Sequence, residues 1–393
     1  MNSFDVAVIG GGIVGVTSAF FLTRRGKKVV VLEKGELAKL TTDNSFAWIN
    51  ASSKAAKDDY HHLNARGLTG YNQLAQQFGE EPLGLNPCGQ LSLVPTEDKV
   101  RYKELRKRWE LLKDKNYPVA WVHAKDLPNL EPSIKFEQEY EALFNFGELC
   151  LDAPRFTRFL ADRLVDQGGS IIENTKVLSL NIDESGQIHG LNTTEDTVSA
   201  DQILLATGPD SAEMLAQLTG FSGFANRFPL NKSPGILLTT PALMPRQLTR
   251  RVVYWEQSPD LHILPHFSGG WRMGADDMDG LISDNNSEEN QRAAGECLLQ
   301  RARERLVDFP ENLSVQDCHI GIGVRPVPED GVSIADLLPG TDNFFVTVTH
   351  SGVTLAPALG QLMAEFIATG TRPEPLFPFS LRRFPGFHED LNL

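Results

Sequence analysis

The sequence predicts an α/β protein with a second domain of α+β type. The N-terminus has the pattern of a strand, a glycine turn and a helix, and residues 153–206 continue with a helix and several strands. The middle, Asn231 to Gly274, instead holds short strand-like runs separated by turns, which is typical of an antiparallel sheet. Because 393 residues exceed what one compact core usually contains, we expect two domains.

A glycine turn directly follows the first predicted strand. The apolar run Val6 to Ile9 indicates a buried parallel strand, and the next six residues are Gly-Gly-Gly-Ile-Val-Gly. Gly10 and Gly12 let the backbone turn sharply and approach a pyrophosphate, and Gly15 lets the following helix pack closely against the strand. This spacing predicts a dinucleotide-binding turn.

The helix after this turn is predicted to span Ile13 to Arg25 and to end at Gly26. Its unpaired N–H groups and the positive end of its dipole would point toward the phosphates. A second strand, Lys28 to Leu32, places Glu33 where a carboxylate can accept hydrogen bonds from ribose hydroxyls. The motif alone does not distinguish FAD from NAD, so an NAD(P)-dependent reductase stays an alternative.

The net charge of the chain limits the classes of partner that it can bind. It carries 51 acidic and 37 basic residues, a formal net charge of −14. Such a charge disfavours nucleic acid and anionic lipid. The basic residues from Arg101 to Arg108 are interleaved with acids and indicate one solvated helix face. We therefore expect small-molecule partners and no nucleic acid.

The four cysteines are far apart in the sequence, at Cys88, Cys150, Cys297 and Cys318. They lack metal-ligand spacing, which indicates a reducing compartment and no structural metal. The apolar N-terminal stretch lacks the basic leader of an export signal, and no segment is long and apolar enough to span a bilayer. We expect a cytoplasmic protein.

Later segments return to alternating strands and helices. Apolar residues at helical spacing predict a helix over Ala153 to Gly168, and Asn343 to Thr349 predicts a strand that leads into a final helix. Four strands are predicted between these two regions, at Ser170 to Ile172, Lys176 to Ile182, Gln187 to Leu191 and Ser199 to Ala206.

Four separated segments resemble the D-amino acid oxidase superfamily of flavoproteins, which includes glycine oxidase, sarcosine oxidase and D-amino acid dehydrogenase. Together they span nearly the whole chain. They are the glycine turn with Glu33, the loop Leu40-Thr41-Thr42, the helix start Leu151-Asp152-Ala153-Pro154 leading to Ala206-Thr207-Gly208, and Gly323-Val324-Arg325-Pro326 with His350-Ser351-Gly352.

The resemblance implies a discontinuous Rossmann-like FAD-binding domain and a substrate domain built on an antiparallel β-sheet. We expect residues 1–85, 150–220 and 320–393 to form the FAD-binding domain. Residues 86–149 and 221–319 would then form the substrate domain. The cofactor site would be assembled from segments that lie far apart in the sequence.

The resemblance also implies which residues bind FAD. Hydroxyls and amides of Thr41 and Thr42 would contact the cofactor, whereas a threonine pair taken alone is more often a turn or a helix cap. The helix after Gly352 would direct its positive end at the flavin edge that gains negative charge on reduction. The full set is Gly10, Gly12, Ile13, Val14, Gly15, Glu33, Lys34, Thr41, Thr42, Asn44, Ser45, Val177, Ala206, Thr207, Gly208, Arg325, Ser351, Gly352, Val353 and Thr354.

Four residues are candidates for the catalytic site. Arg325 precedes a proline in a predicted strand, where the family places the arginine that binds the substrate carboxylate; a structural ion pair is the alternative. Tyr254 and His262 lie on strand-like runs that would cover the substrate, and a histidine at 262 departs from the tyrosine common in the family. His350 lies at a strand end. A purely structural role is the alternative for these three residues.

The implied reaction is oxidation of the C–N bond of a small amino acid or N-substituted amino acid: a D-amino acid, glycine, sarcosine or a proline derivative. A hydride would leave Cα for flavin N5, and the imine would then hydrolyse. Cys318 lies seven residues before Arg325, out of register with the covalent attachment of sarcosine oxidases, so we expect non-covalent FAD.

The sequence leaves the electron acceptor open between oxygen, a quinone and a carrier protein, and with it the choice between oxidase and dehydrogenase. It also leaves open whether the chain forms a homo-oligomer. Besides the nicotinamide-dependent reductase, a flavin-fold subunit without amine oxidase activity of its own stays an alternative.

Overall fold

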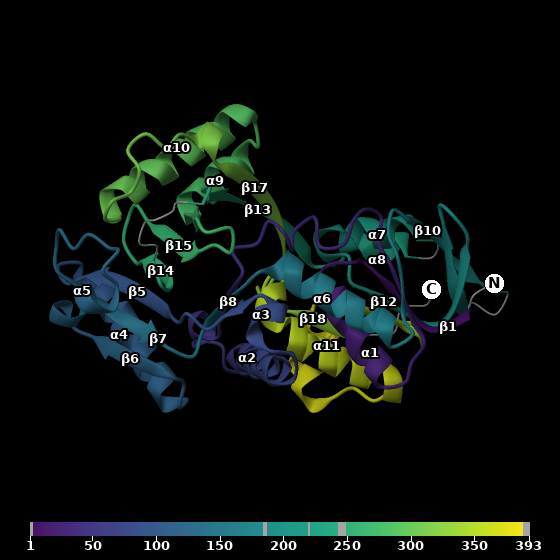
Figure 1. Ribbon diagram of the computed structural model, residues 1–393. Helices are drawn as coiled ribbons and strands as arrows, with labels where there is room; N and C mark the ends of the chain where they lie inside the picture. Colours follow the sequence, from purple (N-terminus) through teal and green to yellow (C-terminus); the bar gives the residue numbers. More distant parts are fainter. Residues whose placement is uncertain (1–2, 184–186, 219–220, 243–248, 388–393) are drawn as a thin grey trace.

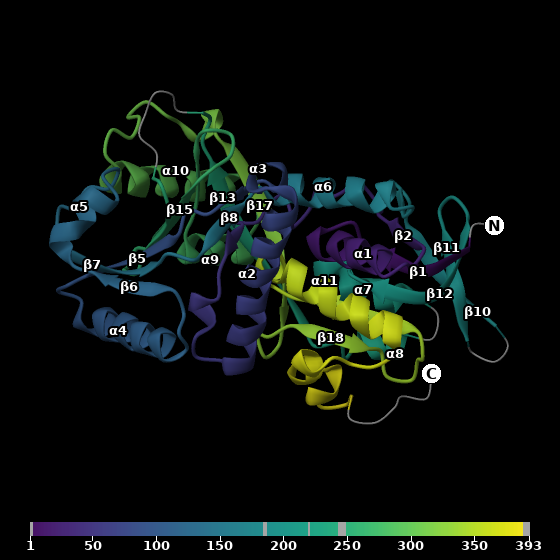
Figure 2. The same cartoon turned by 60° about the horizontal axis from the view of Figure 1, so that its bottom comes forward.

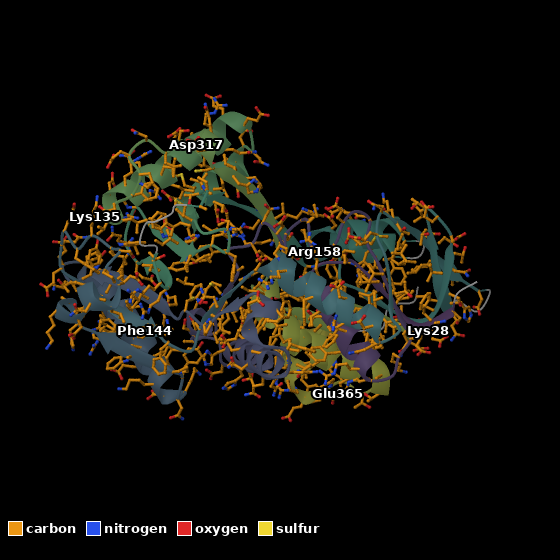
Figure 3. All side chains as sticks on the ribbon, viewed as in Figure 1. Lys28, Lys135, Phe144, Arg158, Asp317 and Glu365 are labelled. Carbon is orange, nitrogen blue, oxygen red and sulfur yellow. The ribbon has the colours of Figure 1, made fainter. Side chains whose placement is uncertain are left out.

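The computed structural model describes residues 3–183, 187–218, 221–242 and 249–387. Figure 1 shows two lobes that meet near α2 (Asp58–Phe78). One lobe contains α1 (Ile13–Arg24) and α11 (Gly352–Thr369), and the other contains α4 (Lys99–Asp114) and α10 (Glu288–Arg305). The charged side chains of Asp317 and Lys28, labelled in Figure 3, lie in different lobes.

A parallel sheet forms the centre of the first lobe. Its five parallel strands run in the order β19-β12-β1-β2-β9. Val6, Ala7 and Val8 of β1 are fully buried, as expected for a strand that is covered on both faces. The bounds are β1 (Ser3–Ile9), β2 (Val29–Leu32), β9 (Ser170–Ile172), β12 (Thr197–Leu205) and β19 (Phe344–Val348).

Helices cover one face of this sheet, and antiparallel strands extend it. Figure 2 shows α1 beside α11, with α6 (Ala153–Asp166) close to α1. β10 (Val177–Ile182) and β11 (Ile188–Thr193) continue from β12 as an antiparallel ribbon. β18 (Ile334–Leu337) pairs antiparallel with β19.

A second sheet forms the centre of the other lobe, in the order β17-β13-β16-β15-β14-β5-β7-β6. Its neighbours are antiparallel except for the parallel pair β14 and β5. The bounds are β5 (Gln90–Pro95), β6 (Val119–Val122), β7 (Tyr140–Asn145), β13 (Leu230–Thr239), β14 (Val252–Trp255), β15 (Leu261–Pro265), β16 (Trp271–Gly274) and β17 (His319–Pro328).

Large aromatic side chains fill the core beside this second sheet. Trp255 and Trp271 are almost fully buried, and the ring of Trp271 stacks on Phe309 at 5.4 Å between centroids. α10 packs over this core, and α9 (Asp276–Asp284) lies against β13. This packing places the first turn of α9 next to the sheet that the sequence predicted to cover the substrate.

Short elements connect the two lobes. A small sheet joins β3 (Trp48–Ile49), β8 (Leu149–Leu151) and β4 (Leu85–Asn86).

The remaining helices are α3 (Glu80–Leu83), α5 (Leu127–Leu130), α7 (Ser211–Gln217) and α8 (Ser222–Ala225), and the tail forms 3-10 turns at Glu374–Phe379 and Leu381–Arg383. Within the described ranges, no helix is long and apolar enough to cross a membrane.

The structure confirms the predicted fold class, because a parallel α/β sheet stands beside a largely antiparallel one. All strands of the first sheet lie within residues 1–85, 150–220 and 320–393. β17 begins the last of these segments, yet it pairs along its whole length with β13 of the second sheet. The domain boundaries themselves stay a prediction.

Candidate active site

A cavity of about 640 Å³ extends between the two sheets. Its lining begins at the glycine turn after β1 and reaches β15 and β17 of the second sheet. Gly15 does not line the cavity, whereas the other predicted residues do. These are Gly10, Gly12, Ile13, Val14, Glu33, Lys34, Thr41, Thr42, Asn44, Ser45, Val177, Ala206, Thr207, Gly208, Tyr254, His262, Arg325, His350, Ser351, Gly352, Val353 and Thr354.

Two glycines of the turn, Gly10 and Gly15, are packed too tightly for side chains. Gly10 has a φ of 112°, and a Cβ there would lie 2.5 Å from the carbonyl oxygen of Ala206. A Cβ at Gly15 would clash with the carbonyl oxygen of Gly10. Gly15 thus allows α1 to start directly beneath the turn, while Gly10 allows the turn to touch the end of β12. The N-terminus of α1 consequently faces the cavity.

Glu33 follows β2 and is held by two backbone amides. Its Oε2 accepts a hydrogen bond from Gly11 N at 2.7 Å, and its Oε1 accepts one from Gly35 N at 2.9 Å. A carboxylate has further lone pairs, so Glu33 can still accept hydrogen bonds from a ribose. Lys34 pairs with Asp210 at 2.6 Å, and about half of its side chain is exposed.

The loop that contains Thr41 and Thr42 touches both lobes. Thr42 Oγ1 accepts a hydrogen bond from Ile13 N at 3.1 Å, which satisfies a free amide at the start of α1. Thr41 Oγ1 donates to the carbonyl oxygen of Val324 on β17 at 2.8 Å. The two hydroxyls thus tie the dinucleotide-binding turn to the second sheet.

Two glycines of β17 and one arginine of β16 hold the same loop. A Cβ at Gly321 or Gly323 would clash with Asn44, so the loop lies directly on the strand. Arg272 donates from Nη1 to the carbonyl oxygen of Ser45 at 2.9 Å. Arg325 therefore lies next in sequence to the strand segment on which the loop rests.

The N-terminus of α11 lies at the same cavity. Ser351 Oγ accepts a hydrogen bond from Tyr60 at 2.9 Å, and Thr354 Oγ1 accepts one from Asn50 N at 3.2 Å. His350 Nδ1 lies 3.3 Å from Ser351 Oγ. Burial lowers the pKa of His350 to about 4, helped by the positive charge of Lys54, so the ring is neutral at pH 7.

Arg325 forms an ion pair within the chain. Its Nη2 lies 2.7 Å from Asp279 Oδ2 of α9 and 3.3 Å from Ser233 Oγ, while 41% of its side chain stays exposed. Burial raises the pKa of Asp279, although the charge of Arg325 opposes this shift. The ion pair weighed as the alternative role of Arg325 is thus present, in a side chain that also lines the cavity. No sequence pattern marked Asp279 as its partner.

Four rings form one wall of the cavity. Tyr254 stacks on His262 with centroids 4.8 Å apart, Phe46 meets His262 edge-on at 4.7 Å, and Trp48 lies 5.0 Å from Tyr254. Burial and the charge of Arg325 lower the pKa of His262 to about 3. Phe46 and Trp48 were missed, although two aromatic residues directly after a predicted cofactor loop are a usable signal.

Two further ionisable groups near the cavity were also missed. Glu148 is fully buried and accepts hydrogen bonds from Trp48 Nε1 at 2.9 Å, Ser52 N at 3.0 Å and Tyr117 at 2.8 Å. It thereby orients Trp48 toward the cavity. Lys54 lines the cavity, and burial lowers its pKa to about 8 against the opposing charge of Glu148.

These features fit FAD. The cavity reaches the glycine turn at Gly10 and Gly12, Glu33 has free lone pairs, and α1 and α11 both begin at the cavity. No cysteine of the described part of the chain lines it, and the thiol of Cys318 donates to the carbonyl oxygen of Ser314. Non-covalent binding of the cofactor stays a prediction.

Comparisons with known proteins give a consistent result. The family described as "DAO: FAD dependent oxidoreductase" matches residues 5–366. A glycine oxidase of Geobacillus kaustophilus is 26% identical over 395 residues, with 98% of each chain covered. An opine oxidase subunit of Agrobacterium tumefaciens is 26% identical over 393 residues, again covering 98% of each. The crystal structure of the Geobacillus glycine oxidase has the same fold, with a TM-score of 0.81 at 23% identity, covering 98% of this chain and all of that one.

Proposed function

We propose that this chain, which belongs to the DAO family of FAD-dependent oxidoreductases, oxidises the C–N bond of a small amino acid or N-substituted amino acid. The observation that carries the proposal is one continuous cavity that links the dinucleotide-binding turn to Arg325 and the aromatic wall. The names of the similar proteins, a glycine oxidase and an opine oxidase subunit, agree with this substrate class.

Arg325 is the proposed binding group for the substrate carboxylate. A guanidinium can hold a carboxylate through two parallel hydrogen bonds, which fixes the orientation of Cα. Asp279 already accepts one hydrogen bond from Nη2, so a substrate would share or displace that contact. The wall formed by Phe46, Trp48, Tyr254 and His262 would exclude water from the other side of the substrate.

The chain would contribute orientation and electrostatics to the reaction. When bound, FAD supplies the acceptor for the hydride that leaves Cα. The N-terminus of α11 would stabilise negative charge that develops beside Ser351 and Gly352. His262 and His350 are neutral at pH 7, so neither requires a counterion there.

The decisive experiment is anaerobic reduction of the purified flavoprotein. Glycine, sarcosine, D-amino acids, proline and N-carboxyalkyl amino acids are added in turn, and bleaching of the flavin absorbance is followed. Reduction by at least one of these amines supports the proposal. Reduction by none, with dithionite still bleaching the flavin, would contradict it and favour a subunit without amine oxidase activity of its own.

We also propose that the chain can act as one subunit of a larger oxidoreductase. The support is its similarity to the opine oxidase subunit over 98% of both chains. The electron acceptor can be identified by re-oxidising the reduced protein. Re-oxidation by air indicates oxygen, re-oxidation by an added quinone indicates a quinone, and re-oxidation only by a cell extract indicates a carrier protein. The native mass of the purified chain distinguishes a monomer from a homo-oligomer. The cytoplasmic location remains a prediction.

A further inference from the structure

Three potential metal ligands converge beside the aromatic wall. They are Asp260, which directly precedes β15, His262 on β15, and Asp276 at the start of α9. One ligand atom from each lies within 4.8 Å of the other two. The backbone amide of Asp276 donates to Asp260 Oδ2 at 2.9 Å, which holds the two acids beside each other.

His262 provides an independent observation. Its side chain is only 8% exposed, and its buried Nδ1 has no hydrogen-bond partner among the residues that the structure describes. Nδ1 lies 4.0 Å from Asp260 Oδ2, which is too far for a hydrogen bond. A buried polar nitrogen without a hydrogen-bond partner lowers the stability of the fold by about 1–3 kcal/mol, so a partner for Nδ1 is expected. In the tautomer that carries its proton on Nε2, Nδ1 has a lone pair that can bind a metal.

The charged side chains around these three residues carry a net negative charge, which favours binding of a cation. Asp277 pairs with Arg301 at 2.5 Å, and Asp279 pairs with Arg325 at 2.7 Å. Arg301 also lies 3.8 Å from Asp260, and the guanidinium of Arg305, which donates to the carbonyl oxygen of Pro259, acts on Asp260 as well. Four carboxylates therefore face three guanidiniums, those of Arg301, Arg305 and Arg325, an excess of one negative charge if all the acids are ionised.

We propose that Asp260, His262 and Asp276 form a binding site for one divalent transition-metal ion. An imidazole with two carboxylates is a ligand set that suits zinc, whereas magnesium prefers oxygen ligands throughout. Three protein ligands leave a position open to water or to another ligand. His262 and Asp276 also line the cavity, so the ion is reachable from the space where the proposed substrate binds. The site does not depend on the proposed reaction.

Zinc binding to the flavin-loaded protein tests this site. The protein is first treated with a chelator and dialysed, and zinc is then titrated while bound metal is measured by mass spectrometry and heat by calorimetry. We expect about one zinc per chain. Asp260→Asn and Asp276→Asn should each weaken zinc binding by at least roughly tenfold. Asp276 is exposed, so its variant tests the site even if Asp260→Asn fails to fold.

Asp284→Asn is the matched control, because Asp284 is an exposed acid at the other end of the same helix. It removes the same charge from α9 and should bind zinc like the unchanged protein. Absence of saturable zinc binding, or equal binding by the unchanged protein and by Asp276→Asn, would overturn the proposal. Neither result depends on whether any amine reduces the flavin, so the site and the proposed reaction fail separately.

Discussion

Replacement of Arg325 by alanine is expected to raise the KM of the oxidised amino acid about thirtyfold while bound FAD is retained. Arg325 lines the cavity, and its guanidinium contacts Asp279 and Ser233. None of the contacts that hold the dinucleotide-binding turn involves this side chain. Flavin retention and substrate affinity should therefore respond separately.

The magnitude follows from the exposure and the partners of Arg325. A hydrogen bond to a charged group contributes about 1.5–3 kcal/mol, and two such bonds form one bidentate contact. Because 41% of the side chain is exposed and Nη2 already contacts Asp279, we take a net contribution of about 2 kcal/mol. At 25 °C this corresponds to the thirtyfold change in KM, with a smaller effect on kcat if the amine still reaches the flavin.

Steady-state kinetics with the best amine from the reduction panel provide the assay, and flavin content is read from absorbance. Arg325→Lys keeps the positive charge but loses the planar guanidinium that can form two parallel hydrogen bonds. The KM of this variant should therefore lie between that of the unchanged protein and that of Arg325→Ala. The double variant Arg325→Ala, Asp279→Asn removes the charge that the single variant leaves unpaired. If the double variant restored the original KM, repulsion by Asp279 would explain the effect and Arg325 would not be the carboxylate-binding group.

Three further predictions concern the scaffold of the site. Gly323→Ala should lower the free energy of unfolding by about 1–3 kcal/mol and reduce flavin retention, because its Cβ meets the carbonyl oxygen of Asn44. Gly223→Ala, with open space around its Cβ, is the control in the same urea titration. Glu148→Ala should cost about 3 kcal/mol in that assay, since Trp48, Ser52 and Tyr117 each lose an acceptor. Between about pH 8 and pH 10.5 the unchanged protein should gain stability relative to Lys54→Met, because over this range the unfolded lysine keeps a proton that the buried one has lost. A constant difference in melting temperature across that range would show that Lys54 titrates normally.

The local elements were largely predictable from sequence, because their signals are local. The strand, glycine turn and helix at the N-terminus need only apolar runs and glycine spacing, and α1 begins at the predicted Ile13. The strand β9 (Ser170–Ile172) also has its predicted bounds. The pairing of β17 with β13 was not predictable in this way, since it joins residues about ninety positions apart.

The residues of the site also divide into those that local sequence signals predict and those that only the tertiary fold brings together. Apart from Gly15, the residues predicted from the glycine turn and the threonine loop line the cavity, because chain connectivity fixes their neighbours. Asp279 and Glu148 could not be named, since each acts through a partner that only the tertiary fold supplies. The expectation that no metal is bound relied on cysteine spacing, which carries no information about an imidazole and two carboxylates brought together by β15 and α9.

The loop from Thr41 to Ser45 couples the two halves of the site physically. Thr42 contacts the start of α1, whereas Thr41 contacts Val324, the residue directly before Arg325. Because Gly323 leaves no gap between loop and strand, a shift of the loop must also shift β17. A cofactor that orders this loop would therefore set the position of Arg325 as well. Flavin-free protein should consequently bind carboxylate ligands more weakly than flavin-loaded protein, and equal affinities in calorimetry would show that the two halves are independent.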